Sequence, residues 1–152
     1  PGFLIGPDAE KEGTIRYGMR AASAILQSKI PWCSVIVRKV FGVAGALHQN
    51  SSRYGMRVAW PSAEWGSLPI EGGVAAAFRR EIEGAPDPKA REQEIEADLR
   101  AFASPFRTAE AFGVEEIIDP RETRPYLCRF IDAAQSRLRT TLGPKPKYGV
   151  RP

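Results

Sequence analysis

In this 152-residue sequence, the segment from Arg38 to Ala46 is the candidate for chemistry, through backbone amides at a turn from a strand into a helix. A mostly β-branched stretch stops at Gly42 and continues into small residues, a pattern typical of a buried strand that turns directly into a helix. The first amides of a helix have no carbonyl partner within it, and the helix dipole adds positive potential at the same point. Such a turn can stabilise an oxyanion, although small residues could equally serve to let a helix pack close to a strand.

The sequence lacks the side-chain motifs of several enzyme classes. It has one histidine, His48, and no GxSxG, HExxH, Walker or GxGxxG motif. Its two cysteines, Cys33 and Cys128, belong to no CxxC pair and no metal-ligand spacing. We therefore expect no metal site, a structural or surface role for His48, and two buried, reduced thiols in a cytoplasmic protein.

The elements that must position the turn alternate between helices and strands. A helix is predicted within residues 7–29, and its buried face is expected to hold Ile15, Met19, Ala22, Ile25 and Leu26. The run 33–40 predicts one strand covered on both faces, and shorter strands are expected at 56–60 and 64–68. The turn at Gly42 would therefore follow the first strand.

Capping signals predict where the helices of the second half of the chain begin. A helix should run from Ile70 to about Glu83, and Asp87 followed by Pro88 should cap an amphipathic, mainly solvated one. A short helix begins at Ser104, a strand covers 114–118, and Asp119 caps the last helix. The expected buried face of that helix holds Leu127, Ile131, Ala134 and Leu138. This alternation predicts an α/β domain at 1–142, with few strands, and an extended Pro/Lys-rich tail at 143–152.

Five runs of the sequence form a series of short signatures, at 1–7, 38–44, 59–64, 71–73 and 118–124. In the same order they resemble signatures of the carboxyltransferase domain of biotin-dependent acyl-CoA carboxylases, the acetyl-/propionyl-CoA carboxylase beta-subunit family. Together they cover nearly the whole chain, which resembles the C-terminal half of that domain. A truncated start, at Pro1 rather than Met, is expected on the same grounds.

The resemblance implies a crotonase-like (ClpP/crotonase) superhelix of β-β-α units, here a partial copy. It implies an oxyanion hole formed by the amides of Val43 and Ala44, with Phe41, Gly42, Gly45 and Ala46 around the biotin. In this family carboxybiotin, held on a carrier domain, releases CO2 and a biotin anion that takes the α-proton of an acyl-CoA. The enolate then attacks the CO2. The neighbouring subunit supplies the acyl-CoA half of the site, so the chain alone should have little activity.

The sequence departs from the family in two places. Val43 stands where the family has glycine, and residues 68–72 replace a Met-Gly-Pro-Glu-Gly-like run. Glu64 and Glu71 are expected to make structural hydrogen bonds. Gly45, where the family often has an aromatic ring, suggests room for an acyl group larger than acetyl.

The resemblance also sets the expected partners and leaves alternatives open. Biotin carboxylase and biotin carrier subunits, an acyl-CoA and further copies of the chain are expected partners. Nucleic acid is not expected, although the net charge of +4 does not itself exclude it. No apolar run approaches the ~20 residues that span a bilayer. A biotin-dependent decarboxylase, a crotonase-type hydratase or isomerase, and a non-catalytic assembly module remain alternatives.

Overall fold

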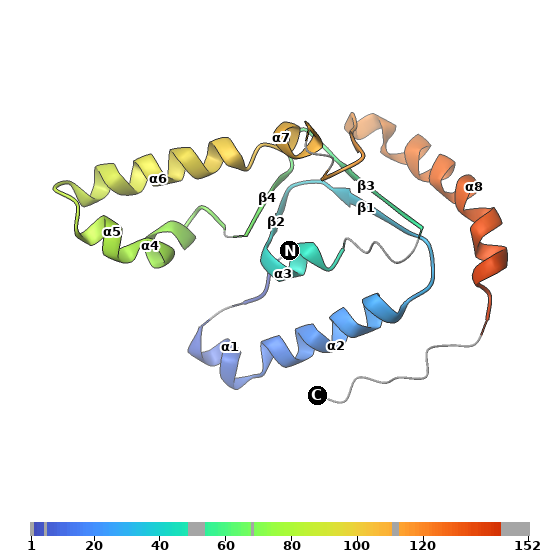
Figure 1. Ribbon diagram of the computed structural model, residues 1–152, viewed down its shortest axis with the longest axis horizontal. Helices are drawn as coiled ribbons and strands as arrows, with labels where there is room; N and C mark the ends of the chain where they lie inside the picture. The colour runs from blue at the N-terminus through green and yellow to red at the C-terminus, as the bar shows by residue number, and fades with distance from the viewer. Residues whose placement is uncertain (1, 5, 49–53, 68, 111–112, 144–152) are drawn as a thin grey trace.

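Two small parallel sheets form the centre of the molecule (Figure 1). The computed structural model describes residues 2–4, 6–48, 54–67, 69–110 and 113–143. One sheet holds β1 (Trp32–Ile36), β3 (Gly55–Ala59) and β5 (Glu116–Ile117) in that order, and the other pairs β2 (Lys39–Phe41) with β4 (Glu64–Gly66). Consecutive strands thus enter different sheets, and each of β1, β2 and β3 pairs with the strand two places later. The predicted α/β class is confirmed.

The single strand predicted at 33–40 is wrong, because the chain bends at Val37 and Arg38. The ladder with β3 ends where the Trp60 amide donates to the Ile36 carbonyl (2.9 Å). A new ladder with β4 starts where the Glu64 amide donates to the Arg38 carbonyl (3.1 Å). The Ser62 hydroxyl donates to the Val37 carbonyl between them (2.7 Å). The bend therefore lets one apolar run supply a strand to each sheet.

The helix predicted at 7–29 is two helices, α1 (Pro7–Lys11) and α2 (Thr14–Gln27). Gly13 separates them with a left-handed φ of 77°. Gly18 and Ala22 form the buried positions of α2, and a Cβ at Gly18 would lie 2.6 Å from the Phe3 ring.

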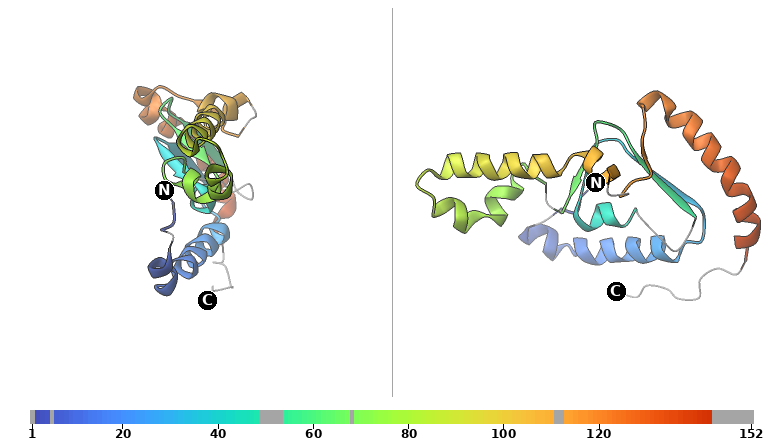
Figure 2. Two further views of the ribbon diagram at one scale, coloured as in Figure 1. Left: turned by 90° about the vertical axis from the view of Figure 1, so that its left-hand side faces the viewer. Right: turned by 45° about the horizontal axis from the view of Figure 1, so that its top comes forward.

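The predicted buried face of α2 is largely wrong. Ile15, Met19 and Leu26 are 58%, 51% and 56% exposed. We call these three side chains the α2 stripe. They are exposed because α2 runs beside α3 (Gly42–Ala46) at a distance from both sheets (Figures 1 and 2).

A helical hairpin projects from the sheets in Figures 1 and 2 and has its own core. It comprises α4 (Gly73–Ala77), α5 (Arg79–Glu83) and α6 (Pro88–Phe102), followed by α7 (Pro105–Glu110). The predicted cap is confirmed, because Asp87 Oδ1 accepts from the amides of Lys89 and Ala90, both at 3.1 Å. The buried core of the hairpin consists of Ile70, Val74, Ile82 and Ile95.

The last helix, α8 (Thr123–Thr141), follows the 3-10 turn η1 (Pro120–Glu122) and covers one face of the β1-β3-β5 sheet. Among its described side chains, Tyr126, Phe130 and Ala134 are buried. The predicted face is therefore correct at Ala134, half-buried at Leu127 and Leu138, and wrong at Ile131, which is 53% exposed. Tyr126 sets this rotation by packing on Val58 and Ile118.

Three further sequence predictions concern the cap at Asp119, the burial of the two cysteines and the C-terminal tail. Asp119, predicted to cap the last helix, instead caps η1 by accepting from the Arg121 amide (2.8 Å), and Glu122 is the residue that precedes α8. Cys33 is partly buried and Cys128 is exposed, so the prediction of two buried thiols is wrong for Cys128. The residues of the predicted tail after 143 lie outside the described residues, and the boundary after 142 stays a prediction.

Candidate functional site

The turn from β2 into α3 is formed by an extended residue followed by a left-handed glycine. Phe41 caps α3 with φ −129° and ψ 152°, and Gly42 has φ +62°, which glycine adopts without the strain that a Cβ would bring. The amides of Gly42, Val43 and Ala44 then have no acceptor four residues earlier within α3. Because α3 has only five residues, these N–H groups, rather than a long helix dipole, are the main source of positive potential.

The valine at position 43 fits this backbone. The left-handed φ falls on Gly42, while Val43 lies inside the α-helix, where a β-branched residue is allowed. Its side chain is 58% exposed, whereas Ala44 is buried. Val43 therefore keeps a backbone amide in the helical conformation, and its side chain lies on the exposed side of the turn.

An apolar cavity of about 380 Å³ opens beside the same turn. It shares a wall with the turn, because a Cβ at Gly42 would lie 3.6 Å from the Ser67 carbonyl oxygen, and Ser67 also lines the cavity. The other residues that line it come from β2, β4 and the hairpin: Phe41, Trp65, Gly66, Ile70, Ala77, Phe78, Leu99, Phe102 and Ala103. The turn and this cavity together form the candidate site, which offers amide donors next to an apolar wall.

Gly45 and Ala46 lie differently from the four residues before them. Gly45 is buried against β2, and a Cβ there would lie 2.8 Å from Val40 Cγ2. Ala46 is exposed. The space at Gly45 is thus already filled by Val40. Gly45 lines a second cavity, together with Trp32, His48 and Arg57, and does not line the apolar cavity at Phe41. An aromatic ring at position 45 would require Val40 to move.

An ion pair ties the strand before the turn to the segment that leads into α4. Lys39 Nζ donates to Glu71 Oε2 at 2.8 Å. This hydrogen bond, together with the backbone amide of Glu71, lowers the pKa of the Glu71 carboxyl. Glu71 therefore has the kind of structural contact that the sequence predicted. Glu64, on β4, lies opposite Lys39 in the ladder.

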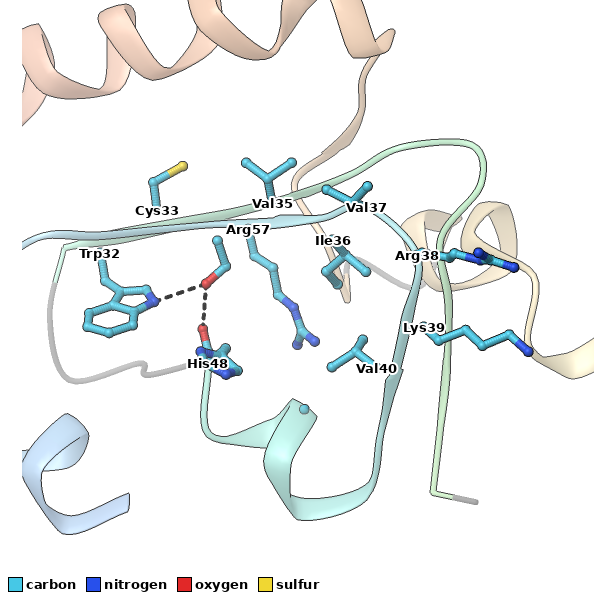
Figure 3. Close-up of a pocket in the computed structure, with 12 residues that line it drawn as sticks. Trp32, Cys33, Val35, Ile36, Val37, Arg38, Lys39, Val40, His48 and Arg57 are labelled. Atoms are coloured by element: carbon cyan, nitrogen blue, oxygen red, sulfur yellow. Dashed lines mark hydrogen bonds between the residues drawn. The ribbon is translucent and has the colours of Figure 1, made fainter. Parts of the chain in front are cut away.

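His48 follows α3 and lines the second cavity (Figure 3). Its carbonyl oxygen accepts from the Ser34 hydroxyl (2.9 Å), and Ser34 Oγ accepts from the Trp32 indole (3.1 Å). The imidazole and indole centroids are 6.3 Å apart. The contacts of His48 are consistent with the structural role expected from the sequence.

The sequence analysis missed Arg57, whose side chain points into this second cavity (Figure 3). Burial lowers the pKa of Arg57, and the charge of Glu115 partly offsets this effect. The only signal in the sequence was a basic residue in the middle of a short apolar strand.

Among the described residues, no group of three or more His, Cys, Asp or Glu side chains could hold a metal ion. No helix among them combines the length and the apolar character that crossing a bilayer requires.

Comparison with known proteins places this geometry in a family. The chain is 34% identical over 156 residues to the carboxyltransferase subunit of propionyl-CoA carboxylase from Haloferax mediterranei, covering all of this chain and 30% of the relative. It is 33% identical over 135 residues to the alpha subunit of methylmalonyl-CoA decarboxylase from Propionigenium modestum, covering 88% of this chain and 26% of the relative. The chain thus spans less than a third of the length of these curated relatives.

A solved structure confirms the predicted fold. The crystal structure of transcarboxylase 12S, a hexamer with methylmalonyl-coenzyme A bound, superposes with a TM-score of 0.72 at 32% identity, covering all of this chain and 29% of that one. The predicted partial copy of a crotonase-like fold is therefore confirmed. Residues 1–148 match the carboxyl transferase domain, and the chain belongs to that family.

Proposed function

We propose that this chain forms part of a carboxyltransferase that moves a carboxyl group from carboxybiotin to the α-carbon of an acyl-CoA. The observation that supports the proposal is the turn at Gly42, where the amides of Val43 and Ala44 have no acceptor within α3 and could together form an oxyanion hole. A family match over residues 1–148 supports the assignment. The enzyme as a whole, its substrate and its partners are part of the proposal, because the chain covers about 30% of its relatives.

The residues around the turn fit the biotin ureido group. Two adjacent amide donors can bind one carbonyl oxygen, and the apolar walls at Phe41 and Trp65 can contact the body of the ring. When bound, carboxybiotin supplies the CO2 and the base for the α-proton. The chain itself supplies the two N–H donors, which stabilise negative charge on the oxygen, and the apolar cavity, which excludes water and strengthens that interaction. No side-chain acid or base is needed for these roles.

The proposed assembly follows the family. A biotin carboxylase and a biotin carrier would deliver the carboxyl group, and a neighbouring copy of the subunit would hold the acyl-CoA. We propose a homo-oligomer in the cytoplasm. The hexamer of transcarboxylase 12S supports an oligomer.

The test replaces Val43 with proline in the enzyme that contains this chain. Proline removes the amide donor and is tolerated in the first turn of a helix. We expect transfer of carboxyl from a carboxylated biotin carrier to propionyl-CoA to fall ~10²- to 10³-fold in kcat. The matched control, Val43→Ala, keeps the amide and should lose little activity. Equal activity of the proline variant and the control would remove the amide from the mechanism.

A decarboxylase is the second candidate, supported by the similarity to the methylmalonyl-CoA decarboxylase subunit. The same amides would serve the reverse direction, so the two candidates differ in net reaction and not in the site. Adding either propionyl-CoA with carboxylated carrier or methylmalonyl-CoA with free carrier, and measuring both initial rates, distinguishes them.

A further inference from the structure

The apolar cavity at Phe41 extends from the α3 turn to the helical hairpin that follows β4 (Figure 1). On the turn side it is lined by Phe41 and by Ser67, whose carbonyl oxygen lies beside Gly42. On the hairpin side it is lined by Ala77 of α4 and Leu99 of α6. Its volume of about 380 Å³ falls in the ~300–1,000 Å³ range of small-molecule sites. The hairpin therefore adds apolar space beyond the turn itself.

The lining of this cavity suits an apolar ligand that enters from solvent. No Asp, Glu, Lys, Arg or His is among the described residues that line it, and four of them are aromatic: Phe41, Trp65, Phe78 and Phe102. Phe102 is 65% exposed, so the cavity opens to solvent beside this ring. A charged or strongly hydrated group would lose its water here without a compensating partner. The lining therefore favours a hydrocarbon chain.

The proposed carboxyl transfer determines which part of an acyl-CoA reaches this cavity. The new bond joins the carboxyl carbon to the α-carbon of the acyl group, and the reacting atoms must approach to ~3–3.5 Å before it forms. The α-carbon therefore lies at the turn. The thioester leads from the α-carbon to the coenzyme, and the rest of the acyl chain leads the other way. Because the cavity shares a wall with the turn, an apolar chain that continues from the α-carbon can enter it directly.

We propose that the hairpin side of this cavity holds the hydrocarbon end of an acyl chain longer than propionyl, and that the substrate is a medium-chain acyl-CoA. Propionyl has one carbon beyond the α-carbon and would leave the space at Ala77 and Leu99 empty. These two residues therefore determine chain-length specificity. The room for a longer chain lies here and not at Gly45, where Val40 already fills the space. This inference rests on the proposed carboxyl transfer and specifies its substrate.

A chain-length series on the enzyme that contains this chain tests the proposal without any variant. Transfer of carboxyl from a carboxylated biotin carrier is measured with propionyl-, butyryl-, pentanoyl- and hexanoyl-CoA. Each methylene that enters the cavity should raise kcat/KM about fourfold, the factor that corresponds to burying one CH2 group. A kcat/KM that stays level or falls from propionyl-CoA to hexanoyl-CoA overturns the inference, whereas the proposed carboxyl transfer would still stand. Absence of transfer to every acyl-CoA would overturn both.

A pair of variants on α4 locates the chain. Ala77 is exposed and lines the cavity, so Ala77→Phe fills space there without displacing the hairpin core. It should lower the ratio of kcat/KM for hexanoyl-CoA to kcat/KM for propionyl-CoA about 10-fold. The matched control is Ala75→Phe, at an exposed position of the same helix that does not line the cavity, and it should keep the ratio within about twofold. Because general destabilisation lowers both rates together, the ratio reports on the cavity. An equal ratio in the two variants would overturn the assignment of the cavity to the acyl chain.

Discussion

Cys33 and Cys128 differ in their surroundings, and this difference should govern their reactivity. Cys128 lies on the exposed side of α8, whereas Cys33 lies on β1 beneath that helix. Burial, and secondarily the charge of Glu115, raises the pKa of the Cys33 thiol. Because the thiolate is the reactive form, Cys33 should stay protonated at a pH where an ordinary thiol, with a pKa of ~8.5, already ionises.

We predict that a thiol reagent such as Ellman's reagent labels Cys128 first at pH 8. In a Cys128→Ser variant, the remaining thiol should react at least 10-fold more slowly, and its rate should keep rising with pH beyond the range in which a free cysteine levels off. The Cys33→Ser variant serves as the control and should label quickly. Fast labelling of the Cys128→Ser variant would contradict the burial of Cys33.

The sequence predicted the turn at Gly42 but not the position of Arg57 in a cavity. The turn was predictable because a strand, a glycine and small residues follow one another directly. Arg57 was not predictable as a cavity residue, because its partner surface comes from Trp32 and His48, which are distant in sequence. The contact of Gly45 with Val40 was missed for a different reason: the two residues are close in sequence, but their contact depends on the direction in which α3 leaves β2.

At the level of elements, the cap of α6 gives a prediction that depends on one side chain. Asp87→Ala removes the acceptor of two amide hydrogen bonds and should lower the free energy of unfolding by ~1 kcal/mol. Asp98→Ala, on an exposed position of the same helix, is the matched control. Chemical denaturation followed by circular dichroism measures both. A loss at Asp98 equal to that at Asp87 would show that the effect comes from charge rather than capping.

The sequence predicted the starts of helices well, because they depend on residues adjacent in the chain. It did not predict which helix faces are buried, because burial depends on residues far away in the chain. The starts of α6 and α7 follow from Asp87-Pro88 and Ser104-Pro105, because capping is local. The buried faces of α2 and α8 depend on which surface each helix meets. In α8, packing on Val58 places Tyr126 inward, a rotation that apolar spacing alone does not specify.

At the level of the whole molecule, the α2 stripe is an apolar surface that another surface should cover. Isolated exposed apolar residues are common, but Ile15, Met19 and Leu26 lie on one side of one helix. The family context favours a second copy of the subunit as the cover.

We therefore predict that the chain self-associates through α2. Light scattering across a concentration series should show an average mass that rises above the 16.7 kDa of the monomer. Met19→Glu should shift this equilibrium toward monomer at least 10-fold, because it would bury a charge in the contact. Ala24→Glu, on the opposite side of α2, is exposed and should have little effect. A monomer at all concentrations would contradict the prediction.

The projecting hairpin has a consequence for chain entropy. It stands between β4 and β5, so the pairing of Val58 with Glu116 closes a loop more than twice as long as the pairing of Trp32 with Gly55. Each doubling of a flexible loop adds only ~0.6 kcal/mol to the entropic cost of closing it. The hairpin reduces even that cost, since its own core of Ile70, Val74, Ile82 and Ile95 holds its two ends close together. Lengthening or shortening α5 and α6 by matched helical turns should therefore leave the sheets, and the turn at Gly42, almost unaffected.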